Sequence, residues 1–157
     1  MNLIDPHHGA LVLVDYQQRL MPAIHHGAEA VAHAVRLADV ARALGLPVLG
    51  TEQNPRGLGP NVPAIRERCD STLAKMHSNG CADGLVERLR EACGGEVGDV
   101  VVAGCEAHVC LMQTALGTPF EEMAGKVKQM LAEAAKRPSA SYYQLMADLL
   151  PFQRNTD

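Results

Sequence analysis

The sequence has few aromatic residues and no long apolar run. Aromatic residues make up 3% of the 157 residues and tryptophan is absent, so stacking platforms for bases are lacking. The 14 basic residues are scattered along a chain of net charge −4 and form no phosphate-binding stripe. No stretch approaches the ~20 apolar residues that a membrane span requires. We therefore expect neither a nucleic-acid partner nor a membrane partner.

Paired cysteine motifs and metal-binding histidine motifs are also lacking. The five cysteines are an odd number at irregular spacing, without a C-x-x-C element. This pattern favours free thiols in a reducing compartment, and the opening residues carry no basic signal-peptide region, so a cytoplasmic location is expected. None of the seven histidines lies in H-E-x-x-H or a similar ligand spacing. We expect no metal site.

Short apolar runs alternate with helical patterns along the first two thirds of the chain. β-branched or aliphatic runs at 10–14, 46–49 and 99–103 predict strands buried on both faces. Between them, 28–44 and 82–92 show helical spacing and end at glycines. Alternating strands and helices predict an α/β fold with a parallel sheet, whose ligands bind beyond the carboxyl ends of the strands.

Other segments predict a loop and further helices. The Gly- and Pro-rich segment 51–63 follows a strand and predicts a loop over the carboxyl edge of the sheet. A helix is expected at 109–116, and the tail predicts two more, at 121–136 and 142–150.

Three residues could carry chemistry at the carboxyl edge. Cys110 follows a strand-ending loop and precedes the expected helix, whose N-terminus would stabilise a thiolate, although a free cysteine is more often a small buried hydrophobe. Asp15 ends the first strand and could accept the thiol proton, or could simply cap a helix. Lys75 could pair with Asp15, although most lysines are solvated surface groups.

Four segments together resemble one family. LVLVDYQQRLMP, TEQNPRGLGPNVPAI, LAKMHSN and VVAGCEAHVCLMQTAL follow one another in the order and approximate spacing of isochorismatase-like cysteine hydrolases. The match covers residues 8–116, and GCEAHVCLMQTAL is its most specific part. The resemblance implies one domain over 1–157 with a three-layer α/β/α fold, and an atypical helical tail over 117–157.

The resemblance also implies roles for individual residues. Cys110 would attack an electrophilic carbon, Asp15 would carry its proton, and Lys75 would hold the charges in place. A cis peptide between Cys105 and Glu106 would aim the N–H groups of Glu106 and Cys110 into an oxyanion hole.

Three more residues are expected to bind substrate: Gln17, from the family's D-x-Q pattern, with Gln53 and His108. Thr51-Glu52-Gln53 stands where one branch of the family has an Asp-x-His metal motif, which implies a metal-free enzyme needing no cofactor. The expected partners are a small-molecule substrate and further copies of the chain in a homo-oligomer.

The sequence departs from the family pattern after Leu116. A segment of roughly a third of a typical domain is missing there, which predicts that the last strand or strands of the family fold are lacking. An alternative is therefore a catalytically impaired protein that serves as an oligomeric binding or scaffolding protein. A second alternative, a redox sensor that uses Cys105 and Cys110, would require a reversible disulfide.

Overall fold

The computed structural model describes residues 8–118. The chain divides into two compact units, Met1–Gly117 and Thr118–Asp157, and the fold described here belongs to the first. The helices expected at 121–136 and 142–150 lie outside the described residues.

A parallel sheet of four strands forms the centre of the first unit. The strands lie in the order β3-β2-β1-β4, and each pairs in parallel with its neighbour. Their bounds are Ala10–Val14 (β1), Val48–Gln53 (β2), Ser71–Lys75 (β3) and Val100–Gly104 (β4). All five residues of β1 are buried, as expected for an apolar strand with neighbours on both sides and helices on both faces.

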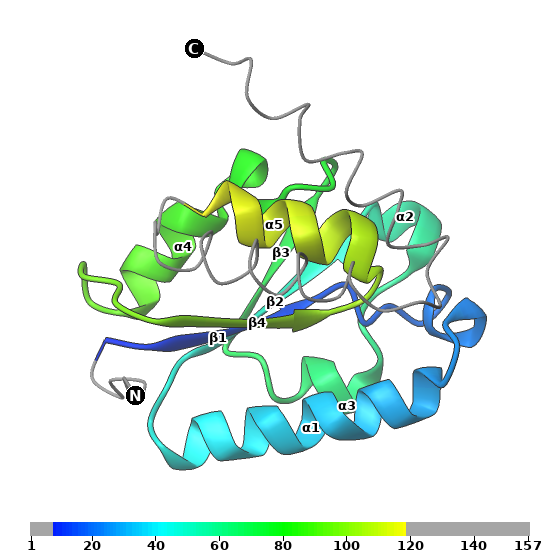
Figure 1. Cartoon of the computed structure of the whole chain (residues 1–157), viewed down its shortest axis with the longest axis horizontal. Coiled ribbons are helices and arrows are strands. Elements are labelled where there is room, and N and C mark those ends of the chain that lie inside the picture. Colours follow the sequence, from blue (N-terminus) through cyan, green and yellow to red (C-terminus); the bar gives the residue numbers. More distant parts are fainter. Residues whose placement is uncertain (1–7, 119–157) are drawn as a thin grey trace, which may run out of the picture. The chain divides into compact units, whose positions relative to one another are not determined.

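Helices cover both faces of this sheet (Figure 1). The long helix α1 (Gly27–Ala43) lies on one face with the short α3 (Pro63–Arg66), and α4 (Leu85–Ala92) and α5 (Met112–Gly117) lie on the other. The remaining helical elements are short: η1 (Met21–Ala23), α2 (Pro55–Leu58), η2 (Gly80–Asp83) and the π-helical turn η3 (Ala107–Leu111). The expected three-layer α/β/α architecture is confirmed.

The main apolar core fills the space between the sheet and α1. Small residues on α1, including Ala34, Ala38 and Ala41, let the helix approach strand residues such as Leu11 and Leu13. The helix predicted over 28–44 is confirmed as α1, and its fully buried side chains are these alanines. The core fixes β1 as the central strand, and its carboxyl end carries Asp15.

The sequence patterns missed one strand and misplaced some boundaries. β3 has the sequence STLAK, which is not an apolar run, and only Leu73 and Lys75 in it are buried. β2 extends through Thr51–Gln53, and α2 and the start of α3 lie in the remainder of the expected loop 51–63. At the carboxyl end of β2, polar side chains replace apolar ones, so the apolar pattern ends before the strand does.

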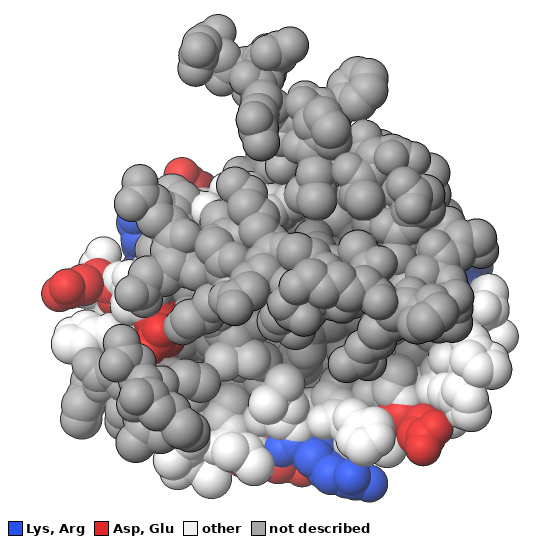
Figure 2. All heavy atoms as spheres, in the orientation of Figure 1, with Lys and Arg blue, Asp and Glu red and all other residues white. Residues whose placement is uncertain are grey.

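The surface and the helix lengths agree with the composition. Figure 2 shows acidic and basic groups of the described residues interspersed on the visible face. Among residues 8–118, no helix has both the length and the apolar character that crossing a bilayer requires.

Candidate active site

The carboxyl ends of the four strands bring the candidate residues to one edge. Asp15 directly follows β1, Gln53 and Lys75 are the last residues of β2 and β3, and Cys110 lies in the turn after β4. Strand register aligns these ends, because Val14 pairs with both Thr51 and Gly104, and Gln53 pairs with Lys75. A parallel sheet thus collects side chains that are far apart in the sequence.

An ion pair between Asp15 and Lys75 lies at the centre of the site. Lys75 Nζ is 2.8 Å from Asp15 Oδ2, and both side chains have 0% exposed surface. Two buried charges persist only when they are paired and hydrogen-bonded. The other carboxylate oxygen, Oδ1, accepts a 2.7 Å hydrogen bond from the Thr51 hydroxyl. Asp15 has a left-handed backbone conformation, φ 57°, which Asp tolerates better than most residues.

The Lys75 ammonium has three further oxygen acceptors. It donates to Gln53 Oε1 at 2.7 Å and lies 3.3 Å from the carbonyl of His77 and 3.5 Å from that of Ser78. These contacts explain how a lysine at the end of an edge strand stays fully buried. They also direct the ammonium toward Asp15 and away from solvent.

The loop after β3 is held in place by two side chains. Asp83 accepts hydrogen bonds from the backbone N–H groups of Met76 and His77, and these bonds, with the His77 ring, lower the pKa of its carboxyl. Thr114 of α5 accepts from the N–H of Gly80 at 3.0 Å and donates to the Ser78 carbonyl at 3.3 Å. Thr114 therefore ties the helix that follows Cys110 to the loop that binds Lys75.

Cys110 is buried in η3, where the charges of both Asp15 and Lys75 act on its thiol. Burial and the negative charge of Asp15 raise the pKa of this thiol to about 11, although Lys75 opposes the increase. This direction runs against the expected thiolate at a helix N-terminus, and that expectation stays a prediction. Cys110 lies inside a π-helical turn, and its thiol lies within the electrostatic influence of the Asp15 carboxylate, which could accept its proton.

The loop before Cys110 depends on a close approach at Gly104. A Cβ atom at Gly104 would lie 2.5 Å from both the Cβ and the carbonyl oxygen of Val14, so only glycine fits there. The expected cis peptide between Cys105 and Glu106 is wrong, because the described residues contain no cis bond. The trans form is cheaper by about 3 kcal/mol for a non-proline residue, and the chain turns here through Glu106 and η3 instead.

The expected substrate contacts differ in how much of each side chain is already engaged. Gln17 is fully buried. Its Oε1 accepts a hydrogen bond from the Gln53 backbone N–H, and its Nε2 donates to the carbonyls of Gln53 and Gly59. Gln53 also donates from Nε2 to the Met76 carbonyl. His108 lies in η3 beside Cys110 and is partly exposed. Their role as substrate contacts stays a prediction.

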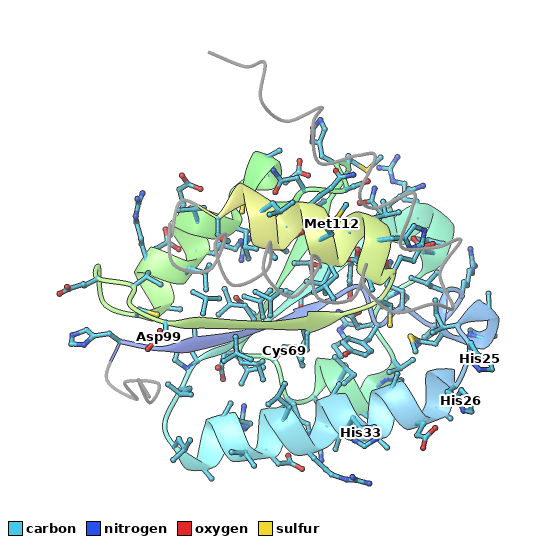
Figure 3. All side chains as sticks on the ribbon, in the orientation of Figure 1. His25, His26, His33, Cys69, Asp99 and Met112 are labelled. Atoms are coloured by element: carbon cyan, nitrogen blue, oxygen red, sulfur yellow. The ribbon has the colours of Figure 1, made fainter. Side chains whose placement is uncertain are left out.

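The histidines do not gather into a ligand set. His25, His26 and His33 lie at the start and on the outer side of α1, away from the sheet (Figure 3), and all three are exposed. Within residues 8–118, no group of three or more His, Cys, Asp or Glu side chains is arranged to hold a metal ion.

A hollow of about 440 Å³ lies at the opposite, amino edge of the sheet. Its lining residues come from the turns that precede β2 and β3 and from the ends of α1 and α4: Arg42, Gly45, Leu46, Pro47, Asp70 and Ala92. Arg42 and Asp70 form an ion pair there at 3.2 Å, with each side chain about half exposed. This hollow is therefore separate from the site around Asp15.

Sequence reasoning missed three residues that hold the site together, namely Thr51, Asp83 and Thr114. Thr51 falls within the predicted loop 51–63, and Thr114 lies in the family stretch GCEAHVCLMQTAL, which carries no sign of this contact. A signal for Thr51 was present, because a β-branched polar residue three positions into a buried strand needs a hydrogen-bond partner inside the protein.

Comparison with known proteins places this arrangement in a family. A model of the isochorismatase domain matches residues 9–124. This chain belongs to the isochorismatase domain family. Isochorismatase domain-containing protein 2A of Mus musculus is 34% identical over 113 residues, which are 71% of this chain and 52% of that protein. The chain thus spans about half the length of that relative.

Solved structures agree with the assignment. The MAR1 ribonuclease of Caenorhabditis elegans is 30% identical and superimposes with a TM-score of 0.64, covering 79% of this chain and 61% of that one. The YcaC protein of Escherichia coli, described as an octameric hydrolase of unknown specificity, is 22% identical with the same TM-score, over 83% of this chain and 74% of that one. The second likeness shows the fold alone.

Proposed function

We propose that this chain is a cysteine hydrolase that acts on a small molecule with an amide, ester-like or vinyl-ether group, and that it needs no cofactor. The observation that carries the proposal is the fully buried Asp15–Lys75 ion pair at 2.8 Å, whose charges act on the buried Cys110 thiol at the same edge of the sheet. Buried charged groups that converge with a thiol of raised pKa at the carboxyl edge of a parallel sheet are typical of active sites. Membership of the isochorismatase domain family supports the same reaction class.

The three residues would share the chemistry of an amide or ester substrate. The Cys110 sulfur forms a bond to the carbonyl carbon while its proton moves to Asp15. The C–N or C–O bond then breaks, and the amine or alcohol leaves with that proton. Water next attacks the thioester and gives a proton to Asp15, which returns it to sulfur as the C–S bond breaks. Lys75 would keep Asp15 oriented and balance its charge.

The negative oxygen that forms during attack needs hydrogen-bond donors. We propose the backbone N–H groups of Glu106 and Cys110 for this role, because both belong to the loop and turn that carry the thiol. His108, in the same turn and partly exposed, is the expected side chain best placed to contact the substrate.

A burst experiment with p-nitrophenyl acetate tests the proposal. The wild-type protein should release p-nitrophenol in a burst and carry an acetyl group on Cys110, located by peptide mass spectrometry. Cys105→Ser is the matched control, since Cys105 is a buried thiol in the same loop, and it should keep the burst. Cys110→Ser and Asp15→Asn should lose it. Acetylation spread evenly over the five cysteines would contradict the proposal.

Two other functions are outcomes of the same experiment. The C. elegans relative is named a ribonuclease, so a synthetic RNA belongs in the substrate panel, and RNA cleavage that survives Cys110→Ser would replace the cysteine mechanism. A wild-type protein with no burst and no substrate would favour the oligomeric binding protein. Light scattering during gel filtration tests the predicted homo-oligomer, and a monomer would contradict it.

A further inference from the structure

The contacts of Lys75 leave it no proton for the substrate. An ammonium has three N–H donors, and four oxygens surround this one: Asp15 Oδ2, Gln53 Oε1 and the carbonyls of His77 and Ser78. The side chain is also fully buried. Lys75 therefore acts in this site as a fixed positive charge and not as a proton donor, and its effect depends on where the ammonium is held.

Among residues 8–118, Gln53 is the one neutral side chain hydrogen-bonded to the ammonium, at 2.7 Å, and each polar group of Gln53 has a partner. Its Oε1 accepts from Lys75 and its Nε2 donates to the Met76 carbonyl at 2.8 Å. Its backbone N–H donates to Gln17 Oε1 at 2.9 Å, and its carbonyl accepts from Gln17 Nε2 at 3.0 Å. The buried Gln17 amide thus pairs with Gln53 as a neighbouring strand would.

We propose that Gln53, held by Gln17, is a positioning residue that fixes the Lys75 ammonium against Asp15. This inference rests on the proposed cysteine hydrolase function and assigns both glutamines a role other than substrate contact. An amide can orient a cation without neutralising it, whereas a carboxylate at the same place would compete with Asp15 for the charge.

The pKa of the Cys110 thiol depends on the position of the Lys75 ammonium. The charged groups that act on the thiol are Asp15 from the end of β1, Lys75 from β3 and Glu106 from the loop after β4. Asp15 and Glu106 raise the pKa of the thiol and Lys75 lowers it. A weaker or displaced positive charge must therefore move the ionisation of Cys110 to higher pH.

The test is the pH dependence of Cys110 alkylation by iodoacetamide in the full-length chain, read by peptide mass spectrometry. Gln53→Glu keeps the size of the side chain and places an anion beside a cation, so the variant should fold. It should raise the midpoint of alkylation by about one pH unit, which makes alkylation about ten-fold slower at a fixed lower pH. Gln53→Met and Gln17→Met should raise the midpoint by less. Gln18→Met, at the exposed neighbouring position, is the matched control and should match the wild type.

The outcomes separate this inference from the function on which it rests. A midpoint in Gln53→Glu equal to those of the wild type and Gln18→Met would overturn the positioning role. If Asp15→Asn still changed the profile in that case, the proposed active site would stand. If neither Asp15→Asn nor Gln53→Glu changed the profile, both the function and the inference would be overturned.

Discussion

The two edges of the sheet each carry an aspartate paired with a basic residue, and the pairs differ in burial. At the carboxyl edge, Asp15 and Lys75 are 2.8 Å apart with 0% exposed side-chain surface. At the amino edge, Arg42 and Asp70 are 3.2 Å apart with 49% and 52% exposed, beside the open hollow. A half-exposed pair adds little to stability, whereas a fully buried pair costs desolvation and marks a site that needs charge. The hollow is thus a weaker indicator of function than the buried pair.

Of the substitutions that test this difference between the two edges, Gly104→Ala should have the largest effect on activity and stability. It would push β4 away from β1 at the carboxyl edge and leave the amino edge unchanged. The new methyl group would overlap Val14, and overpacking of this kind costs about 1–3 kcal/mol. We expect a lower melting temperature and loss of the p-nitrophenol burst. Gly98→Ala, whose added Cβ would come no closer than 3.2 Å to His8, controls for removal of a glycine and should cost less. A Gly104→Ala variant as active as wild type would show that the close approach is not required.

Thr51→Val should have a smaller effect, because it removes one hydroxyl and keeps the shape of the side chain. Asp15 Oδ1 then loses its 2.7 Å hydrogen bond, and hydrogen bonds to charged groups are worth about 1.5–3 kcal/mol. We expect a slower burst and a lower free energy of unfolding, measured in urea. Thr51→Ser restores the hydroxyl and should recover most of the burst. Equal loss in both variants would mean that packing of the methyl group matters and the hydrogen bond does not.

Arg42→Ala should have the smallest effect. It breaks the exposed pair with Asp70 and a hydrogen bond to the Arg68 carbonyl, and exposed pairs are worth about 0–1 kcal/mol. The melting temperature should change little, and the burst at the opposite edge should not change. A large loss of the burst in Arg42→Ala would show that the amino edge takes part in function.

The sequence predicted the layers and the main catalytic candidates for physical reasons. Apolar runs such as 10–14 and the helical spacing of 28–44 indicate burial directly, because each apolar side chain in the core adds to the buried apolar surface that stabilises the fold. Asp15 and Cys110 were found because they follow buried strands, where a parallel sheet collects its functional side chains. The sequence around Lys75 gave little indication of a catalytic role, and that role was predicted only from the family resemblance.

The rest depended on contacts that no local pattern encodes. β3 has the sequence STLAK and carries no apolar run, and the partners that bury its last residue, Lys75, come from other parts of the chain. The Gln17–Gln53 and Thr51–Asp15 hydrogen bonds join residues 36 positions apart in the chain. The raised pKa of Cys110 arises chiefly from burial, with a contribution from Asp15 after β1, whereas its position before a helix predicts a lowered pKa.

The most direct test of the central claim is the ionisation of Cys110, measured by iodoacetamide alkylation against pH in the wild type and in Asp15→Asn. The account predicts a neutral wild-type thiol with a pKa near 11, since burial and Asp15 both raise it. Asp15→Asn removes the negative charge and leaves Lys75 unopposed, so the pKa should fall and alkylation at pH 8 should become faster, while the burst is lost. A wild-type Cys110 that ionises like a free thiol near 8.5, unchanged by Asp15→Asn, would contradict the assembled site.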